Sequence, residues 1–405
     1  MKKRTLISCA AAGAAVVWLT LSIAAQTPQV FDTGTGQKIK VTEVAGGLVH
    51  PFSIAFPDAR TVLIAEKNGR LRILRDGMLQ SKPAWVAPAP PAGAPATAAS
   101  ETLHFIALHP AFAQNHRIYL SYPKYGPKGT STMAVGFGTW TGDELRDFKE
   151  IFAAEAWGSF GANPGQMMFL RDGTLLLTVG DRDGLCCNGS EDTSERMRAQ
   201  DLGNDFGKIL RIRDDGSIPP DNPFVKRAGA RPEIYTYGNR NAYGLAYFPG
   251  TDELWESEIG PLGGDELNVL LPGHNYGWPL VSTGRNYTGT PVSNQPWHRD
   301  GMDDARMSWI PSISPSGLIF YTGDRFKGWK NSAFVGALNG KALWRVTFNN
   351  PKPQQNEQRE QLLTTLNVRI RDVQQAPDGT LYVATEKGAG GATPDGTVLH
   401  IEPAP

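Results

Sequence analysis

The residues best suited to chemistry in this chain gather around one short hairpin. Residues 244–248 and 253–257 read as two apolar strands joined by a Pro-Gly turn. Arg240 and Asn241 directly precede the first strand, and a Gly-Pro step and a carboxylate pair follow the second. Because the two outer ends of a hairpin lie side by side, we expect these groups to converge on one ligand.

The Gly-Pro step is Gly260-Pro261, and the carboxylates are Asp265 and Glu266. Proline lacks an amide donor and turns the chain, so backbone carbonyls are left free to point at a hard cation. Carbonyl and carboxylate oxygens are the ligands that Ca²⁺ prefers. The segment therefore favours a calcium site, with an ordinary turn and a solvated acidic pair as the alternative.

The composition argues against one large class of partner. The 405 residues carry 40 basic and 40 acidic side chains, and hence no net charge. No basic stripe that would bind nucleic acid is present, so no nucleic-acid partner is expected. A small neutral or anionic ligand fits this composition better.

The N-terminus has the form of a secretory signal. Three basic residues at positions 2–4 precede an apolar run over 6–25, which ends in small residues suited to cleavage. We expect residues 1–25 to be removed and residues 26–405 to form a periplasmic or secreted protein without stable membrane insertion. A retained anchor is the alternative, because the run approaches the ~20 residues that span a bilayer.

Two adjacent cysteines, Cys186 and Cys187, remain after the signal is removed. No disulfide framework therefore holds the fold. Neighbouring Cα atoms lie only ~3.8 Å apart, which would strain a bond between the two side chains. In an oxidising compartment that bond is favoured slightly over two free thiols.

A unit of two apolar strands around a Pro-Asp or Asp-Gly turn recurs along the chain. The six copies begin near Ser53, Phe105, Met167, Gly244, Gly317 and Val373. Repeated all-β units are typical of a propeller, whose blades are four-stranded antiparallel sheets around a channel. About 380 mature residues give roughly 63 per blade, more than the ~40–50 of compact repeats, so long loops must decorate the blades.

The sequence therefore predicts an all-β, six-bladed β-propeller as a single domain over 26–405. Residues 397–401 read as a last strand that closes the ring beside a strand near 39–44. The best helical candidate, 195–202, is short.

With these features in place, the chain resembles the soluble quinoprotein sugar dehydrogenases, a family that includes soluble glucose dehydrogenase and the aldose sugar dehydrogenases. The likeness covers nearly the whole mature chain. In chain order, the motifs that carry it are HPAFAQNHRIYLSY, TLLLTVGDR, GKILRIRDDGSIPPDNPF, YGNRNAYGLAY, GPLGGDELN, NYGWP, PSGLIFYTGDRF and RIRDV. The resemblance implies that pyrroloquinoline quinone (PQQ) lies across one end of the propeller channel.

The resemblance also implies roles for the cationic and amide residues. Arg369 and Arg371 match the arginines that hold the quinone's carboxylates, and two guanidinium forks on one face of a strand suit planar anions. Arg240 and Asn241 match the pair that reaches the quinone oxygens, with Arg240 also stabilising charge on the reduced cofactor. Read alone, Arg369 and Arg371 could equally form surface or inter-blade salt bridges.

For the metal, the resemblance implies two calcium ions. Gly260 and Pro261 match residues whose carbonyls bind the calcium that polarises the quinone, and Asp265 and Glu266 match carboxylates at a nearby structural calcium. The implied partners are a sugar or other alcohol, whose hydroxyl group is oxidised, and an external electron acceptor.

The catalytic base departs from the family pattern. The family uses a His in a His-x-x-Gly-Arg stretch, and Ala162 stands at that position. A positioned base typically contributes ~10²–10⁴ in rate, so its loss would leave a weak enzyme or none. The family also carries a Gln near the sugar, and Ser100 stands at about that position in this chain.

Replacement bases within reach are His104, Asp183, Glu101 and Tyr243. His104 lies in an apolar strand, where a hydrogen-bonded core histidine is the alternative, and Asp183 belongs to a turn that could cap itself. Besides the dehydrogenase, a PQQ-binding or ligand-binding propeller without sugar dehydrogenase activity therefore stays open. A calcium-dependent lactonase is less favoured, because its ligands would have to converge from several blades.

Overall fold

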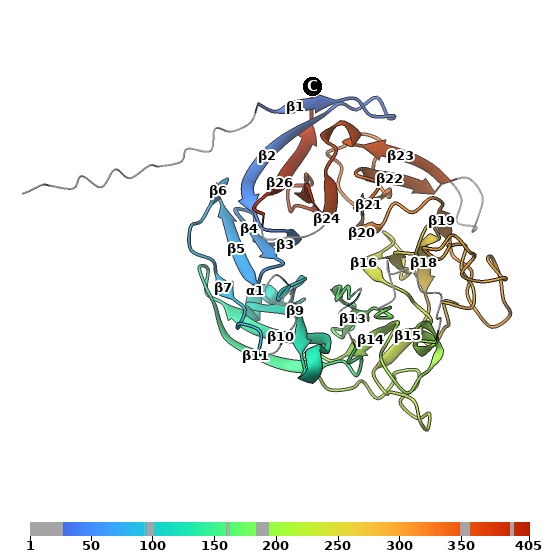
Figure 1. Ribbon diagram of the computed structural model, residues 1–405. Helices are drawn as coiled ribbons and strands as arrows, with labels where there is room; N and C mark the ends of the chain where they lie inside the picture. The colour runs from blue at the N-terminus through green and yellow to red at the C-terminus, as the bar shows by residue number, and fades with distance from the viewer. Residues whose placement is uncertain are drawn as a thin grey trace, which may run out of the picture.

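The computed structural model describes residues 27–92, 94, 101–158, 161, 163–183, 194–348, 357–388 and 393–405. Its strands form six antiparallel sheets set in a ring around a central channel (Figure 1). Four of these sheets have four strands and two have five. The predicted all-β, six-bladed propeller is therefore confirmed.

The first three blades follow one another along the chain. The first contains β3 (Pro51–Asp58), β4 (Thr61–Glu66), β5 (Arg70–Arg75), β6 (Met78–Leu79) and β7 (Trp85–Val86). The second contains β8 (Ile106–Leu108), β9 (Arg117–Tyr125), β10 (Ser131–Trp140) and β11 (Leu145–Ala153). The third contains β12 (Met167–Phe169), β13 (Leu175–Val179), β14 (Lys208–Ile212) and β15 (Ile234–Tyr237).

The last three blades complete the ring. The fourth contains β16 (Ala242–Tyr247), β17 (Leu254–Glu258), β18 (Asp265–Leu270) and β19 (Met307–Trp309). The fifth contains β20 (Pro315–Phe320), β21 (Ala333–Ala337), β22 (Leu343–Phe348) and β23 (Glu357–Leu362). The sixth contains β24 (Arg369–Gln375), β25 (Leu381–Glu386), β26 (Gly396–Pro403), β2 (Ile39–Leu48) and β1 (Gln29–Phe31).

Helical structure in the described ranges is confined to short turns. These are α1 (Phe112–Asn115) and the 3₁₀ turns η2 (Pro127–Gly129), η3 (Arg196–Gln200) and η4 (Thr364–Leu366). The helical candidate at 195–202 thus becomes the single 3₁₀ turn η3. None of these helices has the length and apolar character needed to cross a membrane.

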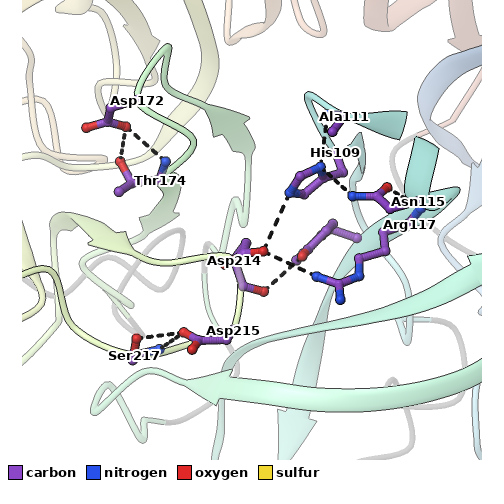
Figure 2. Close-up of polar contacts among 10 residues, drawn as sticks. His109, Ala111, Asn115, Arg117, Asp172, Thr174, Asp214, Asp215 and Ser217 are labelled. Carbon is purple, nitrogen blue, oxygen red and sulfur yellow. Dashed lines mark hydrogen bonds and ion pairs between the residues drawn. The ribbon is translucent and has the colours of Figure 1, made fainter. Parts of the chain in front are cut away.

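The Asp-Gly turns of the repeat form for a local reason. In the turn between β12 and β13, Oδ1 of Asp172 accepts hydrogen bonds from the amide of Thr174 at 2.9 Å and from its hydroxyl at 2.6 Å. Asp215 and Ser217 make the same two contacts after β14 (Figure 2). The residue between each pair is glycine, and Gly173 has φ of 84°, which other residues adopt only with strain.

Polar contacts also tie neighbouring blades together. Asp214, after β14, accepts a hydrogen bond from Nη1 of Arg117 on β9 at 3.2 Å. The hydroxyl of Tyr119 donates to the backbone carbonyl of Asp214 at 2.8 Å, and Nε2 of His109 lies 3.6 Å from the same carboxylate (Figure 2). One acidic residue therefore fastens the second blade to the third.

Apolar packing between blades forms the core. The described residues make six buried clusters, each centred on two adjacent blades, and the cluster between the second and third blades also includes Phe52 of the first. The cluster between the second and third blades includes Tyr119, Val135, Leu177 and Ile234. Side chains alternate between the two faces of a strand, so each blade buries one face against each neighbour.

The six innermost strands, β3, β8, β12, β16, β20 and β24, line the channel. Their C-terminal halves surround a cavity of about 730 Å³, which includes Leu245 to Tyr247 and Gln374 to Pro377. Arg240 precedes β16 and Arg369 begins β24, so both lie toward the opposite mouth. The predicted site residues therefore gather at the N-terminal ends of the inner strands.

The packing between blades can be tested at Leu177, which is fully buried on β13. We expect Leu177→Ala to lower the free energy of unfolding by about 2–5 kcal/mol, because it removes buried methyl groups and leaves a cavity. Met78→Ala, at a side chain that is 67% exposed, is the control and should change stability by less than about 0.5 kcal/mol. Equal denaturation midpoints for the two variants would contradict this account of the core.

Candidate active site

Arg240 links the start of the fourth blade's inner strand to the Gly-Pro turn. Its side chain is almost fully buried, and Nη1 donates to the carbonyl oxygen of Ile259 at 2.7 Å, one residue before Gly260. Its backbone amide donates to Oε2 of Glu258 at 2.7 Å. The two ends of the hairpin therefore lie together, as the sequence predicts.

Trp278 positions Arg240 from the side. The guanidinium carbon of Arg240 lies 5.1 Å from the indole centroid, and that of Arg196 lies 5.5 Å from it. The indole Nε1 donates to Oδ2 of Asp181 at 2.8 Å, and Nε of Arg196 donates to Asp183 at 2.9 Å. The candidate base Asp183 is thus the ion-pair partner of a buried arginine. Sequence reasoning missed Trp278, although the NYGWP motif contains it.

The side-chain amide of Asn241 is buried and has no hydrogen-bond partner among the described residues. Its side chain is 1% exposed, and neither polar atom of its amide hydrogen-bonds to any described residue. A buried polar group without a partner costs about 1–3 kcal/mol, so native proteins rarely leave one without a reason. An uncompensated amide beside Arg240 indicates a site that takes a polar ligand.

Arg369 and Arg371 converge on one buried carboxylate of the same blade. Nε of Arg369 and Nη2 of Arg371 donate to Oε1 of Glu386, at 3.0 and 2.7 Å. Nδ1 of His50 lies 2.6 Å from Oε2 of the same carboxylate. Although burial raises the pKa of Glu386, these cationic neighbours outweigh it and hold the pKa far below its usual value. Both arginines therefore point to one side of β24.

These ion pairs leave donors for a ligand. Nε of Arg371 is buried and has no hydrogen-bond partner in the described part of the chain, while its guanidinium lies 4.8 Å from the Phe52 ring centroid. Nη1 of Arg369 donates to Oδ1 of Asn339 at 2.9 Å. Because a guanidinium carries five N–H groups, Glu386 does not exhaust either arginine.

Tyr243 joins the two halves of the site. Burial raises the pKa of its phenol to about 12, while Arg371 and Arg240 lower it and Glu101 raises it. Arg182 acts on the same phenol. The Tyr243 ring centroid lies 6.4 Å from that of Phe52, and the Arg371 guanidinium lies 4.8 Å from the same Phe52 ring, while Arg240 directly precedes β16, the strand of Tyr243. Groups of the sixth and fourth blades therefore lie near one another at the channel mouth, as a flat anion requires.

The Gly260-Pro261 turn has the main-chain chemistry of a cation site. A Cβ atom at Gly260 would lie 2.4 Å from two carbonyl oxygens, so only glycine fits there. No hydrogen bond among described residues is donated to the carbonyl of Gly260 or Pro261. Asp265 holds this turn: its carboxylate accepts the amide of Gly260 at 2.9 Å, together with donors from residues 312–314.

The structure separates Asp265 from Glu266. They are consecutive on β18, and consecutive side chains of a strand point to opposite faces. Glu266 faces Glu258 across the β17–β18 ladder, and Asn268 bridges Glu266 to Glu256. Burial, with a smaller contribution from Asp265, raises the pKa of Glu266 to about 7. Burial, together with repulsion from Glu266, raises the pKa of Glu256 to about 8. In the described part of the chain, no group of three or more acidic, His or Cys side chains could hold a metal.

The candidate base His104 is fully buried at the start of the second blade. Its Nδ1 donates to the carbonyl oxygen of Pro164 at 3.0 Å, and its ring stacks on Phe52 at a centroid distance of 4.5 Å. It is therefore hydrogen-bonded, as expected for a core histidine. The positions of Ala162, Ser100, Cys186 and Cys187 and of the signal segment 1–25 lie outside the described residues.

The charge on Glu386 can be tested through stability. Because its pKa is held below the usual 4.5, Glu386 contributes stability above that pH and loses it as the pH falls. We expect Glu386→Gln to lower the free energy of unfolding of the ligand-free protein at pH 7 by about 3 kcal/mol, since Arg369 and Arg371 stay buried without a counter-charge. Urea titrations should show this difference shrinking below pH 4.5; a constant difference would contradict the ion-pair account.

Comparison with known proteins supports the resemblance to sugar dehydrogenases that the sequence motifs indicate. Residues 48–393 match the family model described as glucose/sorbosone dehydrogenase. The chain is 36% identical to the aldose sugar dehydrogenase YliI of Escherichia coli K12, over 87% of this chain and 91% of that protein. It is 27% identical to quinoprotein glucose dehydrogenase B of Acinetobacter calcoaceticus, over 73% of this chain and 74% of that one.

Solved structures agree with the sequence matches. The apo form of the aldose sugar dehydrogenase of Escherichia coli superposes with a TM-score of 0.77 at 33% identity, over 90% of this chain and all of that one. The PQQ-bound aldose sugar dehydrogenase of Streptomyces coelicolor gives 0.69 at 25% identity, over 92% of this chain and all of that one. With its six blades and its paired arginines at one mouth of the channel, the chain belongs to the glucose/sorbosone dehydrogenase family.

Proposed function

We propose that this protein is a PQQ- and calcium-dependent oxidoreductase that takes hydride from a sugar or other alcohol hydroxyl. The observation that carries the proposal is that Arg371 and Tyr243 both lie against Phe52, close to Arg240 and to the uncompensated amide of Asn241. Cations and amide donors at one mouth suit a flat, anionic ligand. Family membership supports the same reaction class.

The donor set fits PQQ, a planar tricarboxylate. Arg369 and Arg371 would bind its carboxylates, and Arg240 and Asn241 would bind the quinone oxygens. The carbonyls of the 260–261 turn would hold a calcium ion there. When bound, PQQ supplies the two-electron acceptor and calcium polarises its reacting carbonyl.

The protein itself contributes an electrostatic field that is organised before the ligand binds. Trp278 and the carbonyl of Ile259 hold Arg240 in place before any ligand arrives. Donors that are fixed in a buried site stabilise developing negative charge without reorganisation during the reaction. Arg240 is therefore placed to stabilise the charge that develops on the reduced quinone oxygen.

Two further features belong to the proposal. Electrons leave to an external acceptor, since the reduced cofactor must be reoxidised in each cycle. The protein works in the periplasm or outside the cell, as the basic start and apolar run of residues 2–25 favour. Asp265 shapes the turn that would hold calcium, because its carboxylate accepts the amide of Gly260.

Cofactor binding and turnover can be tested in one sample. Titrating the metal-loaded apo protein with PQQ should give one equivalent bound, and aldoses should then bleach the oxidised chromophore and reduce a dye; omitting calcium should abolish the bleaching. Arg371→Lys should weaken binding about 10–100-fold, because an ammonium cannot replace a bidentate fork. Arg146→Lys, at an exposed outer-strand residue, is the control. An absence of saturable binding would rule the proposal out.

A cofactor-binding propeller without sugar oxidation is the second candidate, and Ala162 favours it. Under that reading PQQ binds with the same stoichiometry, but no aldose or alcohol reduces it. If this second candidate is right, Ala162→His should raise kcat at least ~10-fold at unchanged PQQ affinity, because it restores a base where the family carries one. Steady-state kinetics on a substrate panel measure this. No gain in kcat would mean that a base is already present elsewhere or that the pocket excludes the sugar.

A further inference from the structure

The pair His104 and Glu101 is arranged to accept a proton. A carbonyl oxygen can only accept a hydrogen bond, so the 3.0 Å contact with Pro164 places a hydrogen on Nδ1 of His104. Nε2 of the neutral ring then carries a lone pair. Nε2 lies 3.3 Å from Oε1 of Glu101, but it forms no hydrogen bond with any described residue.

Glu101 supplies the charge that would stabilise a protonated ring. Nζ of Lys67 lies 2.9 Å from its Oε1, and its Oε2 is buried without a hydrogen-bond partner in the described structure. Burial raises the pKa of Glu101, but His104 and Lys67 outweigh it and lower the pKa to about 2. A carboxylate beside an imidazole lone pair gains an ion pair as soon as the ring is protonated.

The Phe52 ring lies between the pair His104 and Glu101 and the channel mouth. Phe52 stacks on His104 at 4.5 Å, and the guanidinium of Arg371 lies 4.8 Å from the same Phe52 ring. The Tyr243 ring centroid is 6.4 Å from that of Phe52, and Glu101 acts electrostatically on the Tyr243 phenol. His104 is fully buried and does not touch a substrate, whereas Tyr243 is partly exposed and can.

We propose that His104 and Glu101 together form the proton acceptor of this site, and that they receive through Tyr243 the proton that a substrate hydroxyl loses. This inference rests on the proposed function. Bound PQQ would accept the hydride of the carbinol C–H bond, and the O–H proton passes to the phenol oxygen of Tyr243. The phenol gives up its own proton, which ends on Nε2 of His104. One carbonyl product, one reduced quinone and one imidazolium result, and the imidazolium returns its proton to solvent.

Among the described residues, the other titratable and charged groups around this pair are Lys67 after β4, Tyr125 on β9, Arg182 after β13, and Arg371 across Phe52. Burial lowers the pKa of His104, and Glu101 opposes that effect. Lys67 acts in the same direction as burial. Removing the charge of Glu101 should therefore lower the pKa of His104 further.

The pH profile of the PQQ-loaded enzyme tests the proposal. A general base must be neutral, so wild-type kcat/KM should rise with pH through the pKa of His104. Glu101→Gln should move this limb about one pH unit lower and reduce the plateau about 10-fold. His104→Gln should lower kcat ~10²-fold or more and remove the limb, with unchanged PQQ affinity, and Tyr243→Phe should lower kcat similarly. His400→Gln, a partly buried histidine on β26, is the matched control.

A second measurement needs no turnover. In apo protein labelled at histidine, the NMR signal that His104→Gln removes identifies His104, and its titration should move to lower pH in Glu101→Gln. An unmoved titration, or wild-type kcat and pH profile in both variants, would overturn the proposal while leaving a dehydrogenase intact. A wild-type protein that binds PQQ yet oxidises nothing would overturn the proposed function, and this inference with it.

Discussion

The site depends on the closure of the ring by the N-terminal strand. β2 pairs antiparallel with β26, with Val41 opposite Ile401, and thereby completes the sheet whose innermost strand is β24. That strand carries the paired arginines, whereas the Gly-Pro turn belongs to the fourth blade. Because β2 continues through His50 into the first blade, this pairing fixes the first blade beside the sixth, and Nδ1 of His50 lies 2.6 Å from Oε2 of Glu386. The ladder between β2 and β26 therefore holds a partner of the paired arginines in place.

Buried polar and charged groups are the second constraint, and they differ in how many partners they have among the described residues. Glu386 is fully engaged by Arg369, Arg371 and His50, so this part of the mouth is rigid without a ligand. Asn241, in contrast, keeps two uncompensated polar atoms. Such a combination of fixed cations and an unsatisfied amide is what a preorganised anion site requires, because the field exists before the ligand arrives. It also explains why the mouth at the N-terminal ends of the inner strands, rather than the cavity at the other end of the channel, is the candidate active site.

Local patterns in the sequence were enough to predict the fold. Each Asp-Gly turn is stabilised within three residues, as Asp172 and Thr174 show, so the repeat can be recognised without any tertiary information. The meeting of hairpin ends at Arg240 is local for the same reason. Partners far apart in the sequence could not be predicted: Glu386 follows His50 by 336 residues, and Trp278 reaches Asp181 across 97. Strand alternation predicts that Asp265 and Glu266 point to opposite faces of β18. That prediction, however, requires knowing that β18 begins at Asp265.

We propose that the arginines of β24 and the carbonyls of the Gly-Pro turn hold one planar tricarboxylate between them. A crystal structure of the protein grown with PQQ and calcium would show this binding. We expect the cofactor's carboxylates within hydrogen-bond distance of Arg369 and Arg371, and a calcium ion on the carbonyl oxygens of Gly260 and Pro261. Density for the cofactor at the opposite end of the channel, or outside the ring of blades, would contradict it.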